Sequence, residues 1–342
     1  MVGLNTDVLV IGGGPAGLAS AIAVRLKGFD VAILDGGVPP IDKACGEGVL
    51  PNGIQALQWL GIPISKEDGF PFHGIRFVDK GKSVEASFHA GYGLALRRTR
   101  LHSILTARAS ELGVRLLWGA PMTDIRSLPS CKWLVGADGI NSRVRRMAGL
   151  ENVVRHPLRF GFRRHYRLSP WTDMVEIHWG KGCQIFVTPL SDEEVGIALL
   201  TRDSQLRLDA ALQQFPKLEG RLRDARMLTG ERGGMTGSRS LPKVICGHIA
   251  LVGDASGSVD AITGDGLSLA FHQAIALAEA FWLGDSSLYQ TKHCRLARRP
   301  KFIERLLLLL GRHPQLRRSL FRMLTLEPSI LPKFLEMHVS SS

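Results

Sequence analysis

The sequence predicts an α/β fold in which a parallel-sheet domain is interrupted by a β-rich domain and followed by helices. Two observations predict this fold. Short apolar strands run through glycine-rich turns into helices at residues 8–26, 133–145 and 249–283. Strand-type residues fill the segments 72–89 and 158–200. Strands that alternate with helices indicate a parallel sheet, whereas successive strands joined by turns indicate an antiparallel one.

These segments divide the chain of 342 residues into three parts. A chain of this length can bury a core large enough for more than one domain. We assign residues 1–60, 90–155 and 245–285 to the parallel-sheet domain. Residues 61–89 and 156–244 form the β-rich domain, and residues 286–342 form a basic helical C-terminal region.

The first segment has the pattern of a dinucleotide-binding unit. An apolar strand at residues 8–11 leads into a glycine turn and a helix of residues 16–26, and a second strand follows. Gly12 allows the tight turn, Gly14 lets the backbone approach a pyrophosphate, and Gly17 lets the helix pack closely on the strand. This complete context is far more specific than the glycines alone.

Two further residues of this unit are expected to serve the nucleotide. The helix that begins at Ala16 presents free N–H groups and its positive dipole end to the phosphates. Asp35 follows the second strand, 18 residues after Gly17, where a carboxylate can accept hydrogen bonds from ribose hydroxyls. We therefore predict a Rossmann-like domain that binds a dinucleotide.

Capping and turn residues set the boundaries of the other elements. We expect a loop over residues 36–53, helices over 54–60 and 267–283, a hairpin turn at 79–82, a helix from 101 to a glycine cap at 113, and strands at 114–117, 133–135 and 249–252. We identify no apolar stretch that approaches the length needed to span a bilayer, and no signal peptide.

Two later segments complete a set of three motifs. Gly136-Ala137-Asp138-Gly139 follows a strand and opens a helix, and Gly253-Asp254-Ala255-Ser256-Gly257 leads through Thr263-Gly264-Asp265-Gly266 into another. In this order, over roughly residues 6–280, the three motifs resemble the FAD-dependent oxidoreductase superfamily of para-hydroxybenzoate hydroxylase-type monooxygenases and geranylgeranyl reductases. The resemblance implies an FAD-binding domain of the glutathione-reductase type with an inserted β-rich substrate domain.

The resemblance also implies roles for single residues. Asp138 would lie near the pyrophosphate, and Asp254 would lie beside the ribityl chain or its phosphate. Gly264 and Gly266 would place a helix N-terminus near the flavin ring, where negative charge develops on reduction. From the residues alone, either aspartate reads equally well as a cap at the start of a helix.

An arginine before a long helix also contacts the cofactor in the superfamily. Arg98 fits the pattern R-x-x-L-H, although Arg97 is one position away. We find no second strand–glycine–helix unit for a pyridine nucleotide, and the glycines at 230, 233, 234 and 237 follow no convincing strand. The resemblance then implies either that NAD(P)H, the electron donor we expect, visits the flavin transiently or that another donor serves.

Fewer residues indicate the branch of the superfamily. The segment Lys43-Ala44-Cys45-Gly46-Glu47-Gly48 resembles the cysteine–glycine segment of geranylgeranyl reductases. The aromatic substrate motif of that branch has no convincing counterpart, and the tryptophan-rich motif of halogenases is absent. Cys45 is the one catalytic residue that we name. Its alternative is a small residue in a tight loop, because thiol reactivity depends on pKa and exposure.

Two reactions on a hydrophobic organic substrate stay open. Monooxygenation, a hydroxylation or epoxidation with NAD(P)H and oxygen, is favoured narrowly because it is widespread in the superfamily. The alternative is reduction of C=C bonds in an isoprenoid or other apolar chain, which the cysteine–glycine segment favours. A flavin-binding protein without turnover is a third and weaker interpretation.

Composition limits the setting in which this chemistry takes place. The five cysteines are scattered and never in C-x-x-C spacing, which indicates free thiols in a reducing compartment and no metal site. We therefore expect a cytoplasmic protein. Its partner is a hydrophobic small molecule and not nucleic acid, since the basic stretch has few aromatic residues and no recognised motif. The oligomeric state stays open.

The positive charge is concentrated near the C-terminus. The chain carries a formal charge of +12, and residues 291–322 hold ten Lys or Arg and one acid, so this stretch supplies +9 and the rest only +3. Leucines lie within the same stretch, which predicts basic amphipathic helices. We favour a helical cap that packs on the body of the protein. The alternative is peripheral contact with an anionic membrane surface.

Overall fold

The computed structural model describes residues 5–339 apart from 63, 125–127, 152–153 and 156–157. Its first layer is a six-stranded sheet in the order β18-β19-β9-β1-β2-β8. In chain order these strands are β1 (Thr6–Ile11), β2 (Val31–Asp35), β8 (Arg115–Trp118), β9 (Cys131–Gly136), β18 (Ile245–Cys246) and β19 (Ile249–Leu251). All neighbours are parallel except the β18–β19 pair. Residues 8–10 of the central β1 are completely buried, as the apolar run predicts.

Helices cover this sheet. They are α1 (Pro15–Leu26), α3 (Arg98–Glu111), the short α4 (Arg143–Met147) and α7 (Gly266–Leu283). Helix α1 packs against both α3 and α7. By length and composition α7 could cross a membrane, so the expectation that no stretch approaches that length is wrong. More than half of α7 is buried against α1, α2 and α8, which makes it a core helix of this fold.

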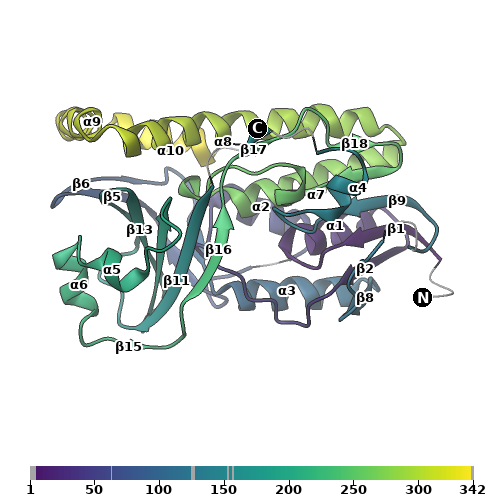
Figure 1. Cartoon of the computed structure of the whole chain (residues 1–342), viewed down its shortest axis with the longest axis horizontal. Helices are drawn as coiled ribbons and strands as arrows, with labels where there is room; N and C mark the ends of the chain where they lie inside the picture. Colours follow the sequence, from purple (N-terminus) through teal and green to yellow (C-terminus); the bar gives the residue numbers. More distant parts are fainter. Residues whose placement is uncertain (1–4, 63, 125–127, 152–153, 156–157, 340–342) are drawn as a thin grey trace.

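The β-rich layer is a second sheet in the order β15-β11-β14-β13-β12-β5-β6, with β16 paired to β11 as well. Its strands are β5 (Gly74–Asp79), β6 (Lys82–Ser87), β11 (Arg159–Arg167), β12 (Met174–Trp179), β13 (Cys183–Ser191), β14 (Glu194–Thr201), β15 (Arg226–Met227) and β16 (Arg232–Thr236). Only β5 and β12 pair in parallel. Gly233 and Gly234, which were expected to follow no strand, lie inside β16. The short helices α5 (Leu208–Leu212) and α6 (Pro216–Leu222) pack at its far end (Figure 1).

Shorter elements join the two layers. A three-stranded sheet consists of β3 (Gly48–Val49), β7 (Gly93–Ala95) and β4 (Phe70–Phe72), and β10 (Val154–Arg155) pairs with β17 (Arg239–Ser240). Two 3-10 turns, η2 (Gly253–Ser256) and η3 (Ala261–Thr263), lie between β19 and α7. Helix α2 (Pro51–Trp59) begins three residues earlier than expected, because Pro51 takes the first helical position, where its missing N–H costs nothing.

The C-terminal helices span both layers along one long edge of the molecule (Figure 1). They are α8 (Ser286–Arg312), α9 (Pro314–Leu326) and α10 (Ile330–Val339). Helix α8 contacts α7 and η3, whereas α9 and α10 contact β6. The fold is therefore the expected α/β FAD-binding type with an inserted β-rich sheet and a helical C-terminus. The expected domain limits stay a prediction, since the β3–β7–β4 sheet draws on residues from both domains.

Candidate functional site

The three glycine motifs meet at one cavity between the two layers. The cavity has a volume of about 580 Å³. Its wall includes Gly12 and Gly14 of the first motif, Asp138 of the second, and Gly253 and Asp254 of the third. These segments lie more than a hundred residues apart in the sequence. They converge because β1, β9 and β19 are neighbours in one sheet and end at the same edge.

The glycines of the first motif serve two different purposes. Gly12 has a φ of 109°, and a Cβ on it would lie 2.4 Å from the carbonyl oxygen of Ala137. A Cβ on Gly17 would lie 1.8 Å from the carbonyl oxygen of Gly12. At Gly14 the nearest atom to such a Cβ is Nη2 of Arg98, 3.8 Å away. Gly12 and Gly17 are therefore required by the packing of the protein, whereas Gly14 faces open space in the cavity.

Asp35 and Ala16 also line the cavity. The Asp35 carboxylate accepts hydrogen bonds from the backbone N–H groups of Gly13 and Gly37, each 2.6 Å long. Asp35 thus fixes the glycine turn and the loop after β2, and both of its oxygens are already engaged by the protein. Ala16 packs toward Gly253, where a Cβ would lie 2.6 Å from the Ala16 Cβ. A larger residue at position 16 would separate the first and third motifs.

A buried histidine fixes the glycine turn from the other side. His102 Nε2 lies 2.9 Å from the carbonyl oxygen of Gly13 and donates to it. Burial lowers the pKa of His102, so the ring stays neutral. The sequence analysis used His102 only as part of a pattern around Arg98. In the structure, the hydrogen bond from His102 holds the glycine turn in place.

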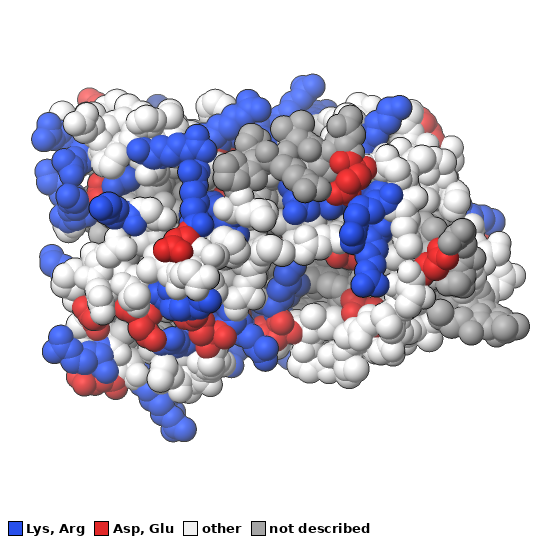
Figure 2. Space-filling model, viewed as in Figure 1, with Lys and Arg blue, Asp and Glu red and all other residues white. Residues whose placement is uncertain are grey.

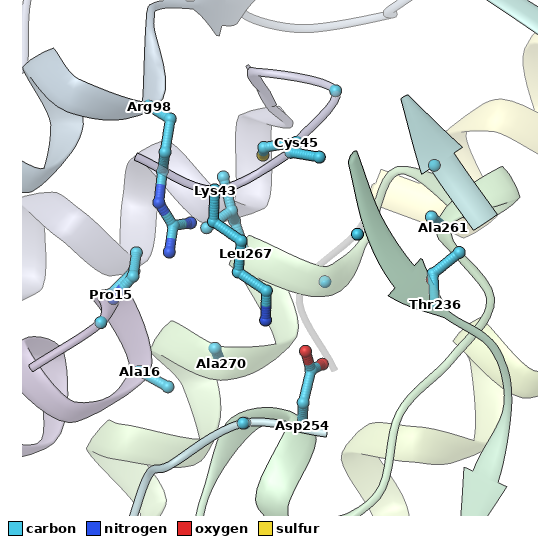
Figure 3. Close-up of a pocket in the computed structure, with 18 of the residues that line it drawn as sticks. Pro15, Ala16, Lys43, Cys45, Arg98, Thr236, Asp254, Ala261, Leu267 and Ala270 are labelled. Atoms are coloured by element: carbon cyan, nitrogen blue, oxygen red, sulfur yellow. The ribbon is translucent and has the colours of Figure 1, made fainter. Parts of the chain in front are cut away.

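The structure separates the two neighbouring arginines. The Nε atom of Arg97 pairs with Glu194 at 2.6 Å, outside the cavity. Arg98 lines the cavity, and its guanidinium points inward beside Pro15 (Figure 3). Within the described part of the chain, the buried Nε of Arg98 has no hydrogen-bond partner. A buried cationic donor without a partner indicates that an acceptor group binds there.

The two aspartates of the later motifs lie in different surroundings. Asp138 accepts hydrogen bonds from the backbone N–H groups of Arg143 (2.6 Å) and Val144 (3.2 Å), so it caps α4. Asp254 lies on η2, makes no capping bond, and directs its carboxylate into the cavity (Figure 3). Both line the cavity. Asp138 therefore hydrogen-bonds the start of a helix, as the capping interpretation expects, and also faces the cavity. Asp254 faces the cavity and makes no such bond.

Gly264 and Gly266 line the cavity where α7 begins. Gly264 has a φ of 70°, a left-handed conformation that favours glycine. Gly266 and Leu267 are the first residues of α7 and both line the cavity, so the positive dipole end of this helix borders it. Gln273, within α7, accepts a hydrogen bond of 2.8 Å from the Gly253 backbone and ties the third motif to this helix.

Cys45 lies in the loop that closes the cavity opposite the glycine turn (Figure 3). Its thiol is partly buried, and Sγ accepts a hydrogen bond of 3.3 Å from the backbone N–H of Glu47. Glu47 adopts a φ of 62°, which is unusual for a residue with a side chain. That backbone conformation turns the Glu47 side chain toward the β-rich layer.

The sequence analysis missed a buried charged cluster behind Cys45. Glu47 Oε1 accepts from Arg163 Nη1 at 2.7 Å and from the backbone N–H of Arg98 at 2.9 Å. Glu47 Oε2 lies 2.7 Å from His165 Nε2. Arg163 also donates to both oxygens of Asp42, at 2.8 and 3.0 Å. Arg163 and His165 face the same side of β11, two residues apart, and this alternation was the only available sequence signal.

Lys43 is a second residue that the sequence analysis did not select. It lines the cavity, and its ammonium extends toward Asp254 from the opposite wall (Figure 3). A Cβ on Gly139 would lie 3.7 Å from Lys43 Nζ, so this cation also borders the second motif. Lys43 and Arg98 together supply positive charge where the three motifs converge.

The other end of the cavity is apolar. Its walls come from the β-rich sheet and from η3, and they include Phe72, Ile75, Ile177, Phe186, Leu200 and Ile262. These side chains belong to a buried cluster that also contains Ile303, Leu307 and Leu310 of α8. The cavity therefore joins a polar end made by the motifs to an apolar end that α8 covers.

These residues fit an FAD molecule. The turn at Gly14 offers space for a pyrophosphate, the Arg98 Nε, which has no partner among the described residues, offers it a donor, and Lys43 adds a second positive charge. The start of α7, at Gly266, fits a group that becomes negative on reduction. Among the described residues no group of His, Cys, Asp and Glu has the arrangement of a metal site.

Comparisons with known proteins agree with this assignment. A family model described as an FAD-binding domain matches residues 7–50. The chain is 29% identical over 327 residues to a menaquinone reductase of Mycolicibacterium smegmatis, covering 84% of this chain and 80% of that protein. It is 26% identical over 326 residues to digeranylgeranylglycerophospholipid reductase 2 of Methanosphaera stadtmanae, covering 83% of this chain and 80% of that protein.

The solved structure of a flavin-dependent brominase has the same fold. It superposes with a TM-score of 0.83 at 18% identity and covers 98% of this chain and 93% of that one. The fold is thus common to enzymes of different chemistry, and the branch has to be argued from the site itself.

Proposed function

We propose that this chain, an FAD-dependent oxidoreductase, reduces C=C bonds in an isoprenoid or other long apolar chain. One observation carries the proposal. The cavity continues from the three FAD motifs into an apolar space walled by Phe72, Ile177 and Leu200. A substrate that is apolar over much of its length matches that wall, whereas a small polar ring would leave it unused.

The relatives support reduction over oxygenation. Both curated relatives described above are reductases by name, and the names menaquinone and digeranylgeranylglycerophospholipid denote molecules with isoprenoid chains. The sequence analysis favoured monooxygenation because of its wide occurrence in the superfamily. The frequency of monooxygenation in the superfamily is a weaker argument than similarity to these two reductases, which extends over about four fifths of the chain.

Bound FAD would supply hydride transfer, and residues of the chain bind the cofactor, position the substrate and deliver the proton. Arg98 and Lys43 hold the negatively charged part of the cofactor, and Gly14 leaves it room. Asp254 faces the same space without a capping role, so it is free to accept hydrogen bonds from the cofactor's hydroxyl groups. The first turn of α7 stabilises negative charge at the reactive end. NAD(P)H is the donor that we propose.

Reduction of a C=C bond also requires a proton for the second carbon. Cys45 lines the cavity, and Glu47, two residues further along the same loop, pairs with His165. The Glu47 backbone N–H already donates to Cys45 Sγ. We assign proton delivery to this group, with Cys45 as the donor that contacts the substrate and the buried pair as its source.

The apolar wall positions the chain for this step and excludes water. Phe72, Phe186 and Ile262 are buried and come from three different elements, so the wall is rigid on every side. Exclusion of water protects the reduced cofactor from side reactions. A pocket that recognises the chain by apolar contact alone discriminates weakly between chain lengths, since one methylene is worth only about 1–3 kcal/mol.

One experiment separates the two reactions. The bound flavin is reduced by light under anaerobic conditions, and an isoprenoid alkene or oxygen is then added while the flavin spectrum is followed. The proposal expects reoxidation by the alkene with a stoichiometric saturated product. Reoxidation by oxygen alone, with formation of a hydroxylated or epoxidised product, would show that the protein is a monooxygenase and contradict the proposal. If neither addition gives a product, then turnover itself is excluded for these substrates and the proposal fails.

A further inference from the structure

The outward face of α8 carries arginines and large apolar residues in one row. The exposed residues along this row are Arg295, Arg298, Phe302, Arg305, Leu309 and Arg312. Their spacing of three or four residues places them on one side of the helix. Phe302 is 57% exposed and Leu309 is 43% exposed, so the packing of the protein does not account for them.

Helix α9, which contacts α8, also carries exposed apolar and basic residues. Leu316, Met323 and Leu326 are 46%, 42% and 80% exposed, and Arg318 and Arg322 lie beside them. Other residues form the inner face of α9. They include Phe321 and Leu324, which are both buried against the β-rich sheet. The helical cap expected from the sequence therefore accounts for the inner leucines. It gives no reason for apolar residues on the outer face.

The charge on this surface is not neutralised within the protein. The buried Arg317 pairs with Asp79, at 2.9 Å, and belongs to the inner face. Among the residues that the structure describes, the exposed Arg295, Arg298, Arg305, Arg312, Arg318 and Arg322 form no ion pair with a carboxylate. In Figure 2 the upper edge, where α8 and α9 lie, is largely blue and white, whereas much of the red lies lower on the molecule.

We propose that the outer face of α8 and α9 docks on an anionic lipid membrane. Arginines bind the anionic headgroups, and Phe302, Leu316 and Leu326 enter the boundary between headgroups and acyl chains. A nucleic acid would match the charge and leave these apolar side chains without a partner. The proposal needs a surface that is both anionic and apolar, and a membrane combines the two.

The position of the surface agrees with the route of an apolar substrate. Ile303, Leu307 and Leu310, on the inner face of α8, pack in the cluster that forms the apolar end of the cavity. The same helix thus packs against the side chains of the apolar wall on one side and carries the docking surface on the other. A substrate held in the membrane would therefore meet the protein on the helix that supports the apolar end of its cavity. This reason rests on the proposed function, whereas the docking itself does not.

The test is sedimentation of the purified holoprotein with vesicles. Vesicles of phosphatidylcholine with phosphatidylglycerol are compared with vesicles of phosphatidylcholine alone, each at low and high salt. The proposal expects sedimentation with the anionic vesicles at low salt, and a marked loss at high salt because screening weakens the arginine contacts. Absence of sedimentation with anionic vesicles at low salt would overturn it. A result that does not depend on anionic lipid would overturn it as well.

Variants locate the surface. The double substitution Arg318→Gln and Arg322→Gln should weaken binding about tenfold or more, since each basic residue near an anionic surface contributes about 1 kcal/mol. Leu316→Ser with Leu326→Ser should weaken it separately through lost apolar contact. The matched control is Arg223→Gln with Arg226→Gln and Met227→Ser, exposed residues at the opposite edge of the molecule. Equal losses in the control would refute the assignment to α9.

Two readouts keep this test apart from that of the proposed function. All substituted residues are exposed and distant from the cavity wall, so FAD content and melting temperature should stay as in the unmodified protein. Turnover of a short alkene dissolved in detergent should also be unchanged, while turnover of substrate embedded in anionic vesicles falls with binding. Failure of alkene reduction would leave the sedimentation result standing.

Discussion

Glu47 and His165 face each other inside the wall of the cavity, with Oε2 and Nε2 2.7 Å apart. They are 2% and 1% exposed and come from the two different layers of the fold. Arg163 Nη1 lies within 3.0 Å of the same His165 nitrogen and can only donate. A hydrogen bond of 2.7 Å between Glu47 and His165 therefore requires one proton between them, whichever residue carries it. Glu47, one of the two residues that share this proton, is two positions after Cys45 in the sequence.

Replacement of Glu47 by Gln should slow alkene reduction about 100-fold, the usual contribution of a positioned acid or base. Glutamine can keep the hydrogen bonds to Arg98 and His165, and it cannot release a proton. The measurement is the rate of flavin reoxidation by the alkene, in water and in deuterium oxide. The solvent isotope effect should rise in this variant, because proton delivery becomes the slow step.

The control for this prediction is Glu194→Gln. Glu194 also pairs with an arginine, Arg97, at 2.6 Å, and it does not line the main cavity. Its substitution should leave both the rate and the isotope effect unaltered. An unchanged isotope effect in Glu47→Gln, with normal FAD content, would reduce Glu47 to a structural partner of Arg163.

The Cys45→Ser protein tests the residue that we propose as the proton donor. A hydroxyl is a weaker acid than a thiol, so alkene turnover should fall sharply while FAD content stays normal. The matched comparison is Cys246→Ser, which alters an exposed thiol on β18. Should Cys45→Ser leave turnover and the flavin spectrum unaltered, the cysteine is only a small loop residue.

Gly14→Val should give colourless protein that still folds. The new side chain would enter the cavity beside Arg98, where the pyrophosphate of the cofactor is expected to lie, and its Cβ would have only Arg98 Nη2 within 4 Å. Absorbance of bound flavin after purification and FAD titration measure the effect. Gly220→Val, at an exposed position in α6 with open space around it, is the control and should remain yellow. A yellow Gly14→Val protein would place the cofactor elsewhere.

Asp254 and Asp138 should respond differently to replacement by alanine. Asp138→Ala removes hydrogen bonds to the first two N–H groups of α4 while the N-cap Ser142 remains, and it should lower stability by about 1 kcal/mol, seen as a lower melting temperature. Asp254→Ala removes no capping bond and should instead weaken FAD binding, measured by titration of the apoprotein. If Asp254→Ala binds FAD as well as the unmodified protein, its carboxylate serves another purpose.

Glu304 on α8 predicts a pH dependence of stability. Burial is the main cause that raises its pKa to about 7 from an ordinary 4.5, and the negative charge of Asp260 adds to the rise, whereas Lys301 and Arg305 act in the opposite direction. Because the folded protein favours the protonated form, the stabilisation is complete below about pH 4.5 and is lost as the pH rises through 7. Glu304→Gln should remove this loss.

The measurement is urea unfolding of both proteins across this range. Above neutral pH the Gln variant should be more stable by up to about 3 kcal/mol, the energy that corresponds to such a shift. Well below pH 4.5 the two proteins should be nearly equal, since Glu304 is then protonated in both the folded and the unfolded state. Parallel pH profiles for the two proteins would contradict a buried neutral Glu304.

Much of the parallel-sheet domain could be predicted from local sequence. The strand at residues 6–11, the helix that follows it and the cap at Gly113 depend on apolar runs, glycines and spacing, which are short-range signals. The position of α2 was less certain, because Pro51 in a glycine-rich stretch suggests a loop as readily as a helix start. These errors concern where elements begin and leave their arrangement unaffected.

The charged cluster in the cavity wall could not be predicted in the same way. Glu47 lies in a loop and Arg163 and His165 lie on a strand more than a hundred residues later, and nothing in either segment alone indicates that they meet. The choice between Arg97 and Arg98 was open for a related reason. Two adjacent side chains at the start of a helix point in different directions, and only their surroundings determine which one faces the cavity.

The sequence by itself determined the cofactor class, because binding of a pyrophosphate requires glycines and a helix start at fixed local spacing. It also determined that the C-terminal helices are basic and amphipathic. Only the tertiary structure decided which face of those helices is buried and that the cavity continues into an apolar space. It also decided that a buried carboxylate and imidazole lie behind Cys45. These properties depend on contacts between distant segments, whose energies local sequence patterns do not contain.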